Sequence, residues 1–234
     1  MYDYTEKMCR DYLIDVEQSD YELVIREEDI LAERELARKT AEADGVEVGN
    51  YPDNYLESLA VYRKIAETLA ADDIILFHGS CIAVDGYAYL FTAKSGTGKS
   101  THTTLWRKVY GDRVCMVNDD KPLIWLSKEG VYIYGTPWDG KHHLSTNTKV
   151  RLGGICILNR ANGEQNSIAH IGGKEAYPML LQQTYRPRQT AELLKVLESI
   201  DKLANHVPIY DMRCNIDEQA AVMAYEYMSQ GCEN

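Results

Sequence analysis

Tyr87-Ala-Tyr-Leu-Phe-Thr-Ala-Lys-Ser-Gly-Thr-Gly-Lys-Ser-Thr101 is the stretch of sequence that decides the fold. Its apolar, aromatic first part ends at Thr92 and predicts a strand, and the residues after Lys99 predict a helix to about Tyr110. The loop between them consists mainly of small residues, which let backbone N–H groups turn inward around phosphate oxygens. The helix adds the positive end of its dipole. This order of strand, loop and helix is typical of a phosphate-binding loop.

The residues of this loop also indicate what it binds. Lys99 can reach the β- and γ-phosphates of a nucleotide, and the hydroxyl group of Ser100 can hold Mg²⁺. The motif begins at Ala93, where glycine is usual, which is a small departure. ATP and Mg²⁺ are the expected cofactors, although these residues do not distinguish ATP from GTP or pyrophosphate. The residues expected to contact them are Ser95, Gly96, Thr97, Gly98, Lys99, Ser100 and Thr101.

The segment before the loop predicts how its strand is paired. Residues 74–84 are apolar and predict a strand, and Asp85-Gly86 is a strong signal for a two-residue hairpin turn. The strand that enters the loop should therefore pair antiparallel with the strand before it. Ordinary Ras-like phosphate-loop proteins begin with a parallel strand–helix–strand unit instead. The sequence thus predicts a mixed, partly antiparallel sheet and an α/β or α+β fold class.

The remaining elements are predicted from apolar periodicity and breaker residues. Residues 1–26 are expected to form short strands. Helices are expected at 27–43, 52–71, 173–184, 188–205 and 217–229, and strands at 113–117, 123–126, 131–134, 150–158, 167–171 and 207–214. We therefore expect a small N-terminal lobe of strands and helices over residues 1–72 and a nucleotide-binding domain over residues 73–234.

Composition excludes several classes of function. The formal net charge is −11, and the first 50 residues carry fifteen Asp and Glu against six Lys and Arg. A chain this acidic, without a basic stripe, is not expected to bind nucleic acid or an anionic membrane surface. The acidic N-terminal region is interpreted as a solvated face rather than a docking surface for a basic partner. The six scattered cysteines, and the absence of a signal peptide or a long apolar run, predict a cytoplasmic protein.

Two adjacent carboxylates are the first catalytic candidates. Asp119 and Asp120 follow a predicted strand, twenty residues after Lys99. One of them could bind Mg²⁺, directly or through water, and the other could accept the proton of an attacking hydroxyl group. The sequence does not decide which aspartate has which role. The alternative interpretation is a simple Asp–Asp turn.

His78, Trp138 and Lys141 are further candidates. His78 lies within the first predicted strand of the hairpin and could tune the protonation of the aspartates, or it could be an ordinary buried histidine. The following Gly79 permits a close approach of the backbone. Trp138 and Lys141 lie in a polar loop from Gly135 to Asn147. They are candidate substrate or phosphate contacts, and a plain surface loop is the alternative.

These motifs together support a resemblance to a known family. The order His78-Gly79, hairpin, Ala93-Lys-Ser-Gly-Thr-Gly-Lys99-Ser100 and Val117-Asn-Asp119-Asp120 resembles the C-terminal kinase domain of HPr kinase/phosphorylase. More broadly, it is similar to the phosphoenolpyruvate carboxykinase-like nucleotide-binding fold. The resemblance covers about residues 74–135. The Glu-Ile-Arg-Gly-like segment of HPr kinases is missing, and the sequence has Gly135-Thr-Pro-Trp-Asp-Gly-Lys141 after the aspartates instead.

The resemblance implies a function and the residues that carry it. It implies that Lys99 and Ser100 grip the nucleotide and Mg²⁺, and that Asp119 and Asp120 serve metal binding and base catalysis with His78 beside them. The expected activity is transfer of a phosphoryl group from ATP to a hydroxyl, most directly a serine of a small protein, a peptide or a free amino acid. The resemblance also implies that the protein forms a homo-oligomer. The alternatives are a nucleotide-binding regulatory module without activity and, disfavoured by chain length, a carboxykinase acting on a small dicarboxylate.

Overall fold

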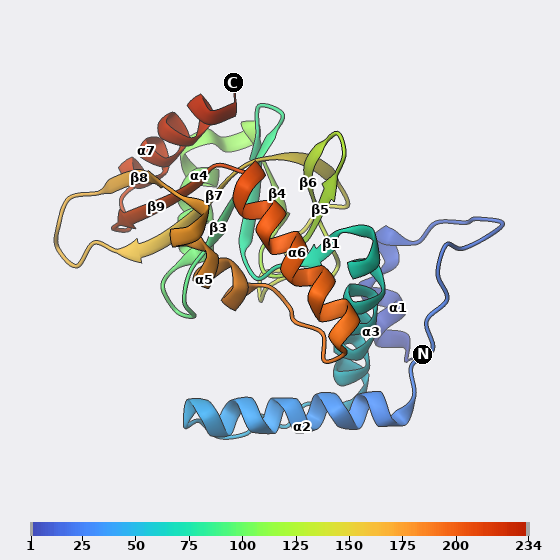
Figure 1. Cartoon of the computed structure of the whole chain (residues 1–234). Helices are drawn as coiled ribbons and strands as arrows, with labels where there is room; N and C mark the ends of the chain where they lie inside the picture. Colours follow the sequence, from blue (N-terminus) through green and yellow to red (C-terminus); the bar gives the residue numbers. More distant parts are fainter. Residues whose placement is uncertain (1, 233–234) are drawn as a thin grey trace. The chain divides into compact units, whose positions relative to one another are not determined.

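The chain divides into two compact units in a computed structural model that describes residues 2–232. The first unit comprises residues 1–68 and the second residues 69–234. Figure 1 shows the order of their helices and strands along the chain.

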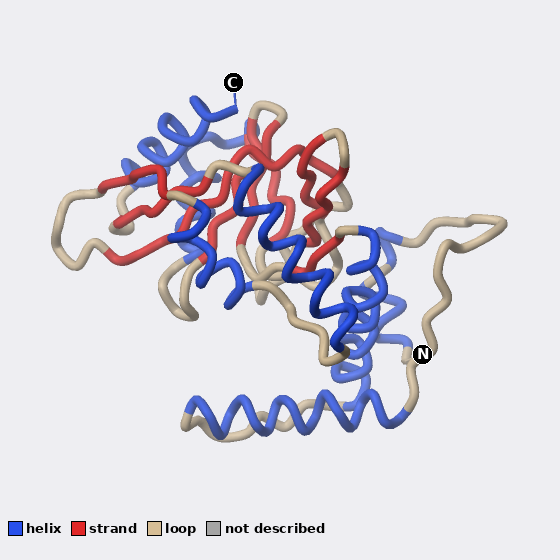
Figure 2. Tube along the Cα trace, in the orientation of Figure 1, coloured by secondary structure: helices blue, strands red, loops and turns tan. Residues whose placement is uncertain are grey.

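The N-terminal unit contains helices and loops but, over its described residues, no strand (Figure 2). Its elements are α1 (Asp3–Met8), a short 3₁₀ helix (Arg10–Tyr12), α2 (Glu27–Asp44) and α3 (Asp53–Leu69). The helices predicted at 27–43 and 52–71 are confirmed. The short strands predicted at 1–26 are wrong. A strand is stable only when a neighbour pairs with its backbone, and apolar residues such as Ile14, which is 79% exposed, find no such neighbour here.

Buried carboxylates in this unit are paired. Glu33 accepts two hydrogen bonds from the guanidinium group of Arg63. Glu57 accepts hydrogen bonds from the hydroxyl group of Thr5, at 2.9 Å, and from the backbone N–H of Tyr2. Because an unpaired buried charge is strongly destabilising, these contacts explain how so acidic a segment forms packed helices.

The second unit is built on one nine-stranded mixed sheet. The strand order along its main path is β1-β5-β6-β7-β3-β2-β4, and β9 lies between β7 and β8. Neighbours β3, β7 and β9 run parallel, and the other pairs are antiparallel. The bounds are β1 (Ile74–Leu76), β2 (Ser80–Val84), β3 (Tyr87–Thr92), β4 (Val114–Asn118), β5 (Leu123–Ser127), β6 (Gly130–Tyr134), β7 (Lys149–Arg160), β8 (Ser167–Ile171) and β9 (Ile209–Cys214).

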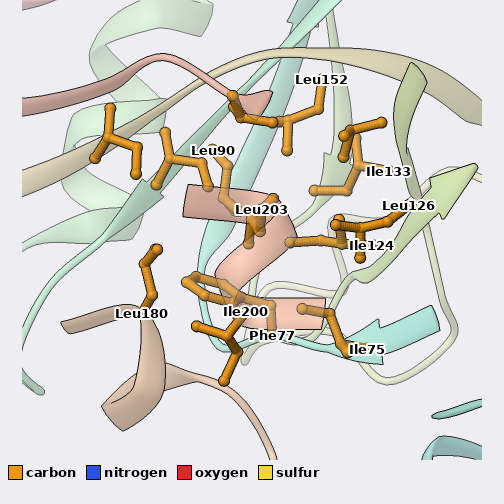
Figure 3. Packing of buried hydrophobic residues seen from close by; sticks show 14 of the residues in the cluster. Ile75, Phe77, Leu90, Ile124, Leu126, Ile133, Leu152, Leu180, Ile200 and Leu203 are labelled. Atoms are coloured by element: carbon orange, nitrogen blue, oxygen red, sulfur yellow. The ribbon is translucent and has the colours of Figure 1, made fainter. Parts of the chain in front are cut away.

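Helices cover both faces of this sheet. One layer contains α5 (Gly173–Gln183) and α6 (Thr190–His206), and the other contains α4 (Lys99–Tyr110) and α7 (Glu218–Ser229). Each layer has its own apolar core. Figure 3 shows Ile200 and Leu203 of α6 packed among Ile75 and Leu90 from the sheet and Phe77 from the segment after β1. The opposite core centres on Trp106 of α4, which is fully buried.

The predicted hairpin is confirmed. Asp85 and Gly86 both have positive φ angles, 51° and 86°, as a tight primed turn requires. Strands β2 and β3 pair antiparallel from Val84↔Tyr87 to Ser80↔Phe91. The predicted mixed, partly antiparallel sheet is therefore correct. Among the described residues, no helix has the length and apolar character needed to cross a membrane.

The single strand predicted at 74–84 is wrong, because the chain breaks between β1 and β2 at residues 77–79. The backbone N–H groups here bond to three different carbonyl groups: Phe77 to Pro122, His78 to Gln183 and Gly79 to Asp120. These acceptors lie in loops and at the end of a helix rather than along one strand. The break brings His78 to the segment that follows β4.

Candidate functional site

The loop between β3 and α4 is held by its own backbone. Gly96 and Gly98 have φ angles of 75° and 123°, which residues with a side chain rarely adopt. The N–H of Thr97 bonds to the carbonyl oxygen of Lys94 at 3.2 Å. Helix α4 begins directly at Lys99. The first-turn N–H groups of a helix have no partner within the helix, so this end of α4 can bind an anion.

Arg160 lies beside this loop, although it was not among the residues expected from the sequence. It ends β7, and its Nη2 atom donates a hydrogen bond to the carbonyl oxygen of Gly96 at 2.6 Å. Strand β7 runs parallel to β3, with Ile157 opposite Thr92. The residues that follow both strands therefore meet at the same edge of the sheet. The sequence has no local signal for this contact, because it depends on the strand order.

Asn118 positions the two aspartates. It is fully buried at the end of β4, and its Oδ1 atom accepts hydrogen bonds from the backbone N–H groups of Asp120 and Lys121, at 2.8 and 2.6 Å. Its Nδ2 atom donates to both oxygens of Thr136, at 3.0 and 3.1 Å. One side chain thus defines the turn that carries Asp119 and Asp120 and ties it to the loop that follows β6 (Gly130–Tyr134).

The carboxylate group of Asp120 has two cationic or polar neighbours. The Nε2 atom of His78 lies 3.2 Å from its Oδ1, and the ammonium group of Lys121 pairs with its Oδ2. Burial raises the pKa of Asp120, but the hydrogen bond from His78 and the charge of Lys121 outweigh it and hold this pKa well below its usual range. Asp120 therefore stays ionised at neutral pH. The predicted proximity of His78 to the aspartates is confirmed.

The backbone around His78 is held by hydrogen bonds and by close packing. The carbonyl oxygen of His78 accepts a hydrogen bond from the Thr92 hydroxyl at 3.1 Å, and its N–H donates to Gln183. Gly79 follows at a position where a Cβ atom would lie 2.7 Å from the side chain of Leu90 and 3.0 Å from the carbonyl oxygen of Phe91. Any larger residue would push the His78 segment away from β3.

Asp119 is connected to α4 by two hydroxyl groups that were not expected from the sequence. It is 4% exposed, and its Oδ1 accepts from Ser80 Oγ at 3.2 Å. Ser80 Oγ also lies 3.0 Å from Oγ1 of Thr103, whose single proton bonds either to Ser80 or to the carbonyl oxygen of Ser100, 3.2 Å away. This chain of contacts joins Asp119 to the first turn of α4, where Ser100 lies.

Lys99 lies within the electrostatic influence of both aspartates. It is partly buried, and this desolvation lowers its pKa, while the charges of Asp120 and Asp119 act in the opposite direction. The net shift is downward. The tertiary structure therefore brings together the residues that the sequence proposed as the centre of the site: Lys99, Asp119, Asp120 and His78.

Trp138 and Lys141 lie in the loop that follows β6. Trp138 is 8% exposed, and its carbonyl oxygen accepts a hydrogen bond from Thr136 at 3.4 Å. This burial favours a structural role over direct contact with a substrate. Lys141 is exposed. It follows Gly140, where a Cβ atom would lie 2.8 Å from Oδ2 of Asp119, so this loop passes directly over the carboxylate.

The oxygen atoms present fit a magnesium ion better than a metal held wholly by protein. Among the described residues, no three His, Cys, Asp or Glu side chains cluster in a metal-binding arrangement. Magnesium in phosphoryl-transfer sites typically takes one or two carboxylates together with phosphate oxygens and water. Asp119 and the hydroxyl group of Ser100 are oxygen groups that would suit such an ion. A cavity of about 740 Å³ lies at the opposite end of β3 and β7, where Tyr87 and Arg151 line it. Neither Asp119 nor Ser100 lines this cavity.

Comparison with known proteins finds similar solved structures but no similar family. No family model and no curated protein matches the chain. A solved structure described as the Hpr(Ser) kinase/phosphatase from Coxiella burnetii is similar, with a TM-score of 0.36 and 10% sequence identity. The match covers 66% of this chain and 98% of that one. A likeness of this size establishes neither a shared activity nor a shared substrate.

Proposed function

We propose that this protein is a phosphotransferase that moves the γ-phosphoryl group of ATP to a hydroxyl group, in a reaction that depends on Mg²⁺. The observation that carries this proposal is the placement of two carboxylates, Asp119 and Asp120, where both act on the ammonium group of Lys99. Lys99 begins the helix that follows a phosphate-binding sequence motif. A cation for phosphate and a carboxylate for the attacking hydroxyl are the two parts that phosphoryl transfer needs side by side.

Different residues bind the phosphates and accept the proton. Lys99 and the backbone amides of residues 95–101 bind and orient the phosphates. Asp120 accepts the proton of the acceptor hydroxyl as a new O–P bond forms and the bond from the γ-phosphorus to the bridging oxygen of the leaving ADP breaks. His78 and Lys121 keep Asp120 ionised and oriented for this step. Catalysis is then mainly positioning and charge stabilisation.

Asp119 and Ser100 are the residues that would hold Mg²⁺. The chain of contacts through Ser80 and Thr103 places Asp119 beside the start of α4, which favours Asp119 as the metal ligand and Asp120 as the base. A bound Mg²⁺ would neutralise the negative charge of the β- and γ-phosphates. In this proposal, the activity belongs to residues 73–234, and residues 1–72 form a separate lobe.

The class of acceptor rests on the sequence resemblance. The order of His78, the phosphate-binding loop and the paired aspartates resembles HPr kinase/phosphorylase and related kinases, which phosphorylate serine hydroxyl groups. We therefore propose a serine of a small protein, a peptide or free serine as the acceptor. The polar loop from Gly135 to Asn147 passes over Asp119 and is the segment that we propose lies on the acceptor side of the site.

One observation favours a second function, a nucleotide-binding regulatory module without transfer. Both oxygens of Asp120 already have partners, His78 and Lys121. In such a module these contacts would be purely structural, and no acceptor hydroxyl would reach the carboxylate. The two functions differ in whether labelled phosphate leaves the nucleotide.

The test is transfer of labelled γ-phosphate from ATP with Mg²⁺ into an extract of cells that make this protein. We expect a labelled product with the wild-type protein, and its mass identifies a protein, peptide or small-molecule acceptor. Lys99→Ala should lose nucleotide binding and transfer together. Asp120→Asn should bind nucleotide normally and lose at least about 10²-fold in transfer rate, as is typical for a missing general base.

Matched variants control for non-specific effects. Lys174→Ala and Asp112→Asn remove exposed charges far from the site and should transfer phosphate like the wild type. Nucleotide binding without a labelled product in any fraction would favour the regulatory module. An Asp120→Asn variant as fast as the wild type would exclude Asp120 as the base.

A further inference from the structure

A second pocket adjoins the proposed phosphate site. It has a volume of about 380 Å³ and is lined by Gly96–Gly98 of the loop, the first turns of α4, and the segments that end or follow β7 and β9. In open α/β sheets, ligands bind in the crevice outside the carboxyl ends of parallel strands. This pocket lies at the carboxyl ends of the parallel strands β3, β7 and β9. It includes neither Asp119 nor Asp120.

His102, on α4, lines this pocket and has a hydrogen-bond donor without a partner. Its side chain is 2% exposed, and its Nε2 atom lies 3.1 Å from Nε1 of Trp106. An indole N–H can only donate, so Nε2 of His102 must be the acceptor. The neutral ring therefore carries its proton on Nδ1. Among the described residues, this Nδ1 atom is buried and has no hydrogen-bond partner.

A buried donor without an acceptor is unfavourable, and native proteins rarely leave one unmatched. The ring itself is fixed by the contact with Trp106 and by packing against Phe91, whose ring centroid lies 4.6 Å away. His102 therefore cannot turn its Nδ1 to solvent without losing both contacts. Because His102 lines the pocket, a ligand that packs against its ring there is a source of an acceptor.

The other walls suit a flat aromatic ligand. Leu105 and Leu158 line the pocket, and Ile216 lies at its edge with 80% of its surface exposed. Arg160, which bonds to the carbonyl oxygen of Gly96, also lines the pocket and so connects it to the phosphate-binding loop. Polar side chains, among them Asn162 and Asn215, complete the lining. Apolar surface combined with a few polar groups is typical of a pocket for a small ligand.

We propose that this pocket receives the base of a purine nucleotide whose phosphates lie on the loop, with Nδ1–H of His102 donating to a ring nitrogen of the base. The inference rests on the proposed nucleotide-binding function and adds the position of the base and the side chain that recognises it. A purine fits because both of its rings carry unprotonated nitrogens, and its two-ring face can cover the apolar surface of Leu105, Leu158 and Ile216.

Two substitutions at His102 separate the roles of its two nitrogens. The amide of glutamine reaches the position of Nε2, so His102→Gln keeps an acceptor for Trp106 and removes the Nδ1 donor. Asparagine reaches the position of Nδ1, so His102→Asn keeps a donor there and removes the acceptor for Trp106. Calorimetry would measure the binding of ATP, CTP and inorganic tripolyphosphate to each full-length protein with Mg²⁺.

We expect the wild type to bind ATP at least tenfold more tightly than tripolyphosphate or CTP. His102→Gln should bind ATP about fivefold more weakly, as expected for one lost hydrogen bond, with unchanged affinity for tripolyphosphate. His102→Asn should bind ATP more tightly than His102→Gln does. In ¹⁵N-labelled wild type, the Nδ1–H resonance of His102 should shift on addition of ATP but not of tripolyphosphate, and this readout does not depend on the folding of a variant.

Four results would contradict parts of the inference. Equal affinity of the wild type for ATP and tripolyphosphate would overturn the base pocket and leave the phosphate site intact. Equal affinity for ATP and CTP would overturn the choice of a purine. A His102→Gln variant that weakens ATP and tripolyphosphate alike would make His102 purely structural. Failure of the wild type to bind either ligand would refute the proposed function and this inference with it.

Discussion

The Nε2 atom of His78 lies 3.2 Å from Oδ1 of Asp120, although the two residues come from separate parts of the chain. His78 lies in the break between β1 and β2, and Asp120 follows β4. Because β2 and β4 are neighbours in the sheet, the ends of both segments meet. This relationship holds Asp120 ionised, and it determines how the protein should respond to acid.

Asp120→Asn should flatten the acid side of the stability curve. Burial raises the pKa of Asp120, but the hydrogen bond from His78 and the charge of Lys121 lower it further. A carboxyl group with a lowered folded-state pKa stabilises the fold above its unfolded pKa, about 4, and this contribution is lost as the pH falls below that value. The wild type should therefore lose thermal stability below about pH 4 more steeply than the variant.

Differential scanning calorimetry across this range is the measurement. Asp112→Asn, an exposed aspartate without a partner in the described structure, should retain the acid behaviour of the wild type. Parallel curves for the wild type and Asp120→Asn would mean that Asp120 is not held ionised by its neighbours.

Asn118→Ala should destabilise the protein and slow transfer. The substitution removes the acceptor for two backbone N–H groups of the aspartate turn and the donor to Thr136. Because all of these groups are buried or partly buried, we expect a loss of about 2–3 kcal/mol in the free energy of unfolding. Urea denaturation measures this loss. Asn205→Ala, at an exposed helical position, should cost nothing measurable. Equal stability of the two variants would contradict the role of Asn118.

Gly140→Ala should raise the Mg²⁺ requirement with little effect on folding. The new Cβ atom would lie 2.8 Å from Oδ2 of Asp119, so this carboxylate must move. Displacing a metal ligand through its neighbour typically costs about tenfold or more in metal affinity. We therefore expect about a tenfold rise in the Mg²⁺ concentration that gives half-maximal transfer.

Gly172→Ala is the matched control for this substitution. A Cβ atom at Gly172 would meet no atom within 4 Å. This variant should show the Mg²⁺ dependence of the wild type, with at most about 1 kcal/mol lost at the start of α5. If Gly140→Ala also behaves like the wild type, Asp119 is not a magnesium ligand.

Arg160→Ala should weaken nucleotide binding by about fivefold, because it removes the guanidinium contact to the carbonyl oxygen of Gly96 and leaves the loop less ordered. Calorimetric titration with ADP and Mg²⁺ measures the change. Arg213→Ala removes an exposed arginine from the neighbouring strand, where it pairs with Glu164, and should leave the affinity unchanged. Identical affinities for the two variants would show that Arg160 does not support the loop.

Much of the fold could be predicted because its signals are local. The turn at Asp85-Gly86, the helices α2 to α7 and most strands follow from turn chemistry and apolar periodicity within a few residues. The errors come from segments whose conformation depends on distant partners. Apolar residues at 12–16 looked like a strand but have no neighbouring strand to pair with. The segment 77–79 leaves the strand because its N–H groups bond to Pro122, Gln183 and Asp120.

The candidate site shows the same division. Lys99, Asp119, Asp120 and His78 were identifiable because each occupies a recognisable position next to a loop, a strand end or a glycine. Ser80, Thr103, Asn118 and Arg160 were not, because a serine, threonine, asparagine or arginine at a strand end has many ordinary uses. Only the neighbours that the fold supplies distinguish these residues from others of their type.

The sequence by itself determined the chemistry available to this protein: a glycine-rich loop before a helix with Lys99 at its start, two carboxylates after a later strand, and a hairpin that makes the sheet mixed. These are properties of short segments, in which side-chain type and backbone preference decide the outcome. The tertiary structure decided which groups share a hydrogen bond and a local electric field. Such interactions weaken steeply over a few ångströms, and the sheet order, together with the break at residues 77–79, brings His78 to Asp120, Ser80 to Asp119 and Arg160 to the loop.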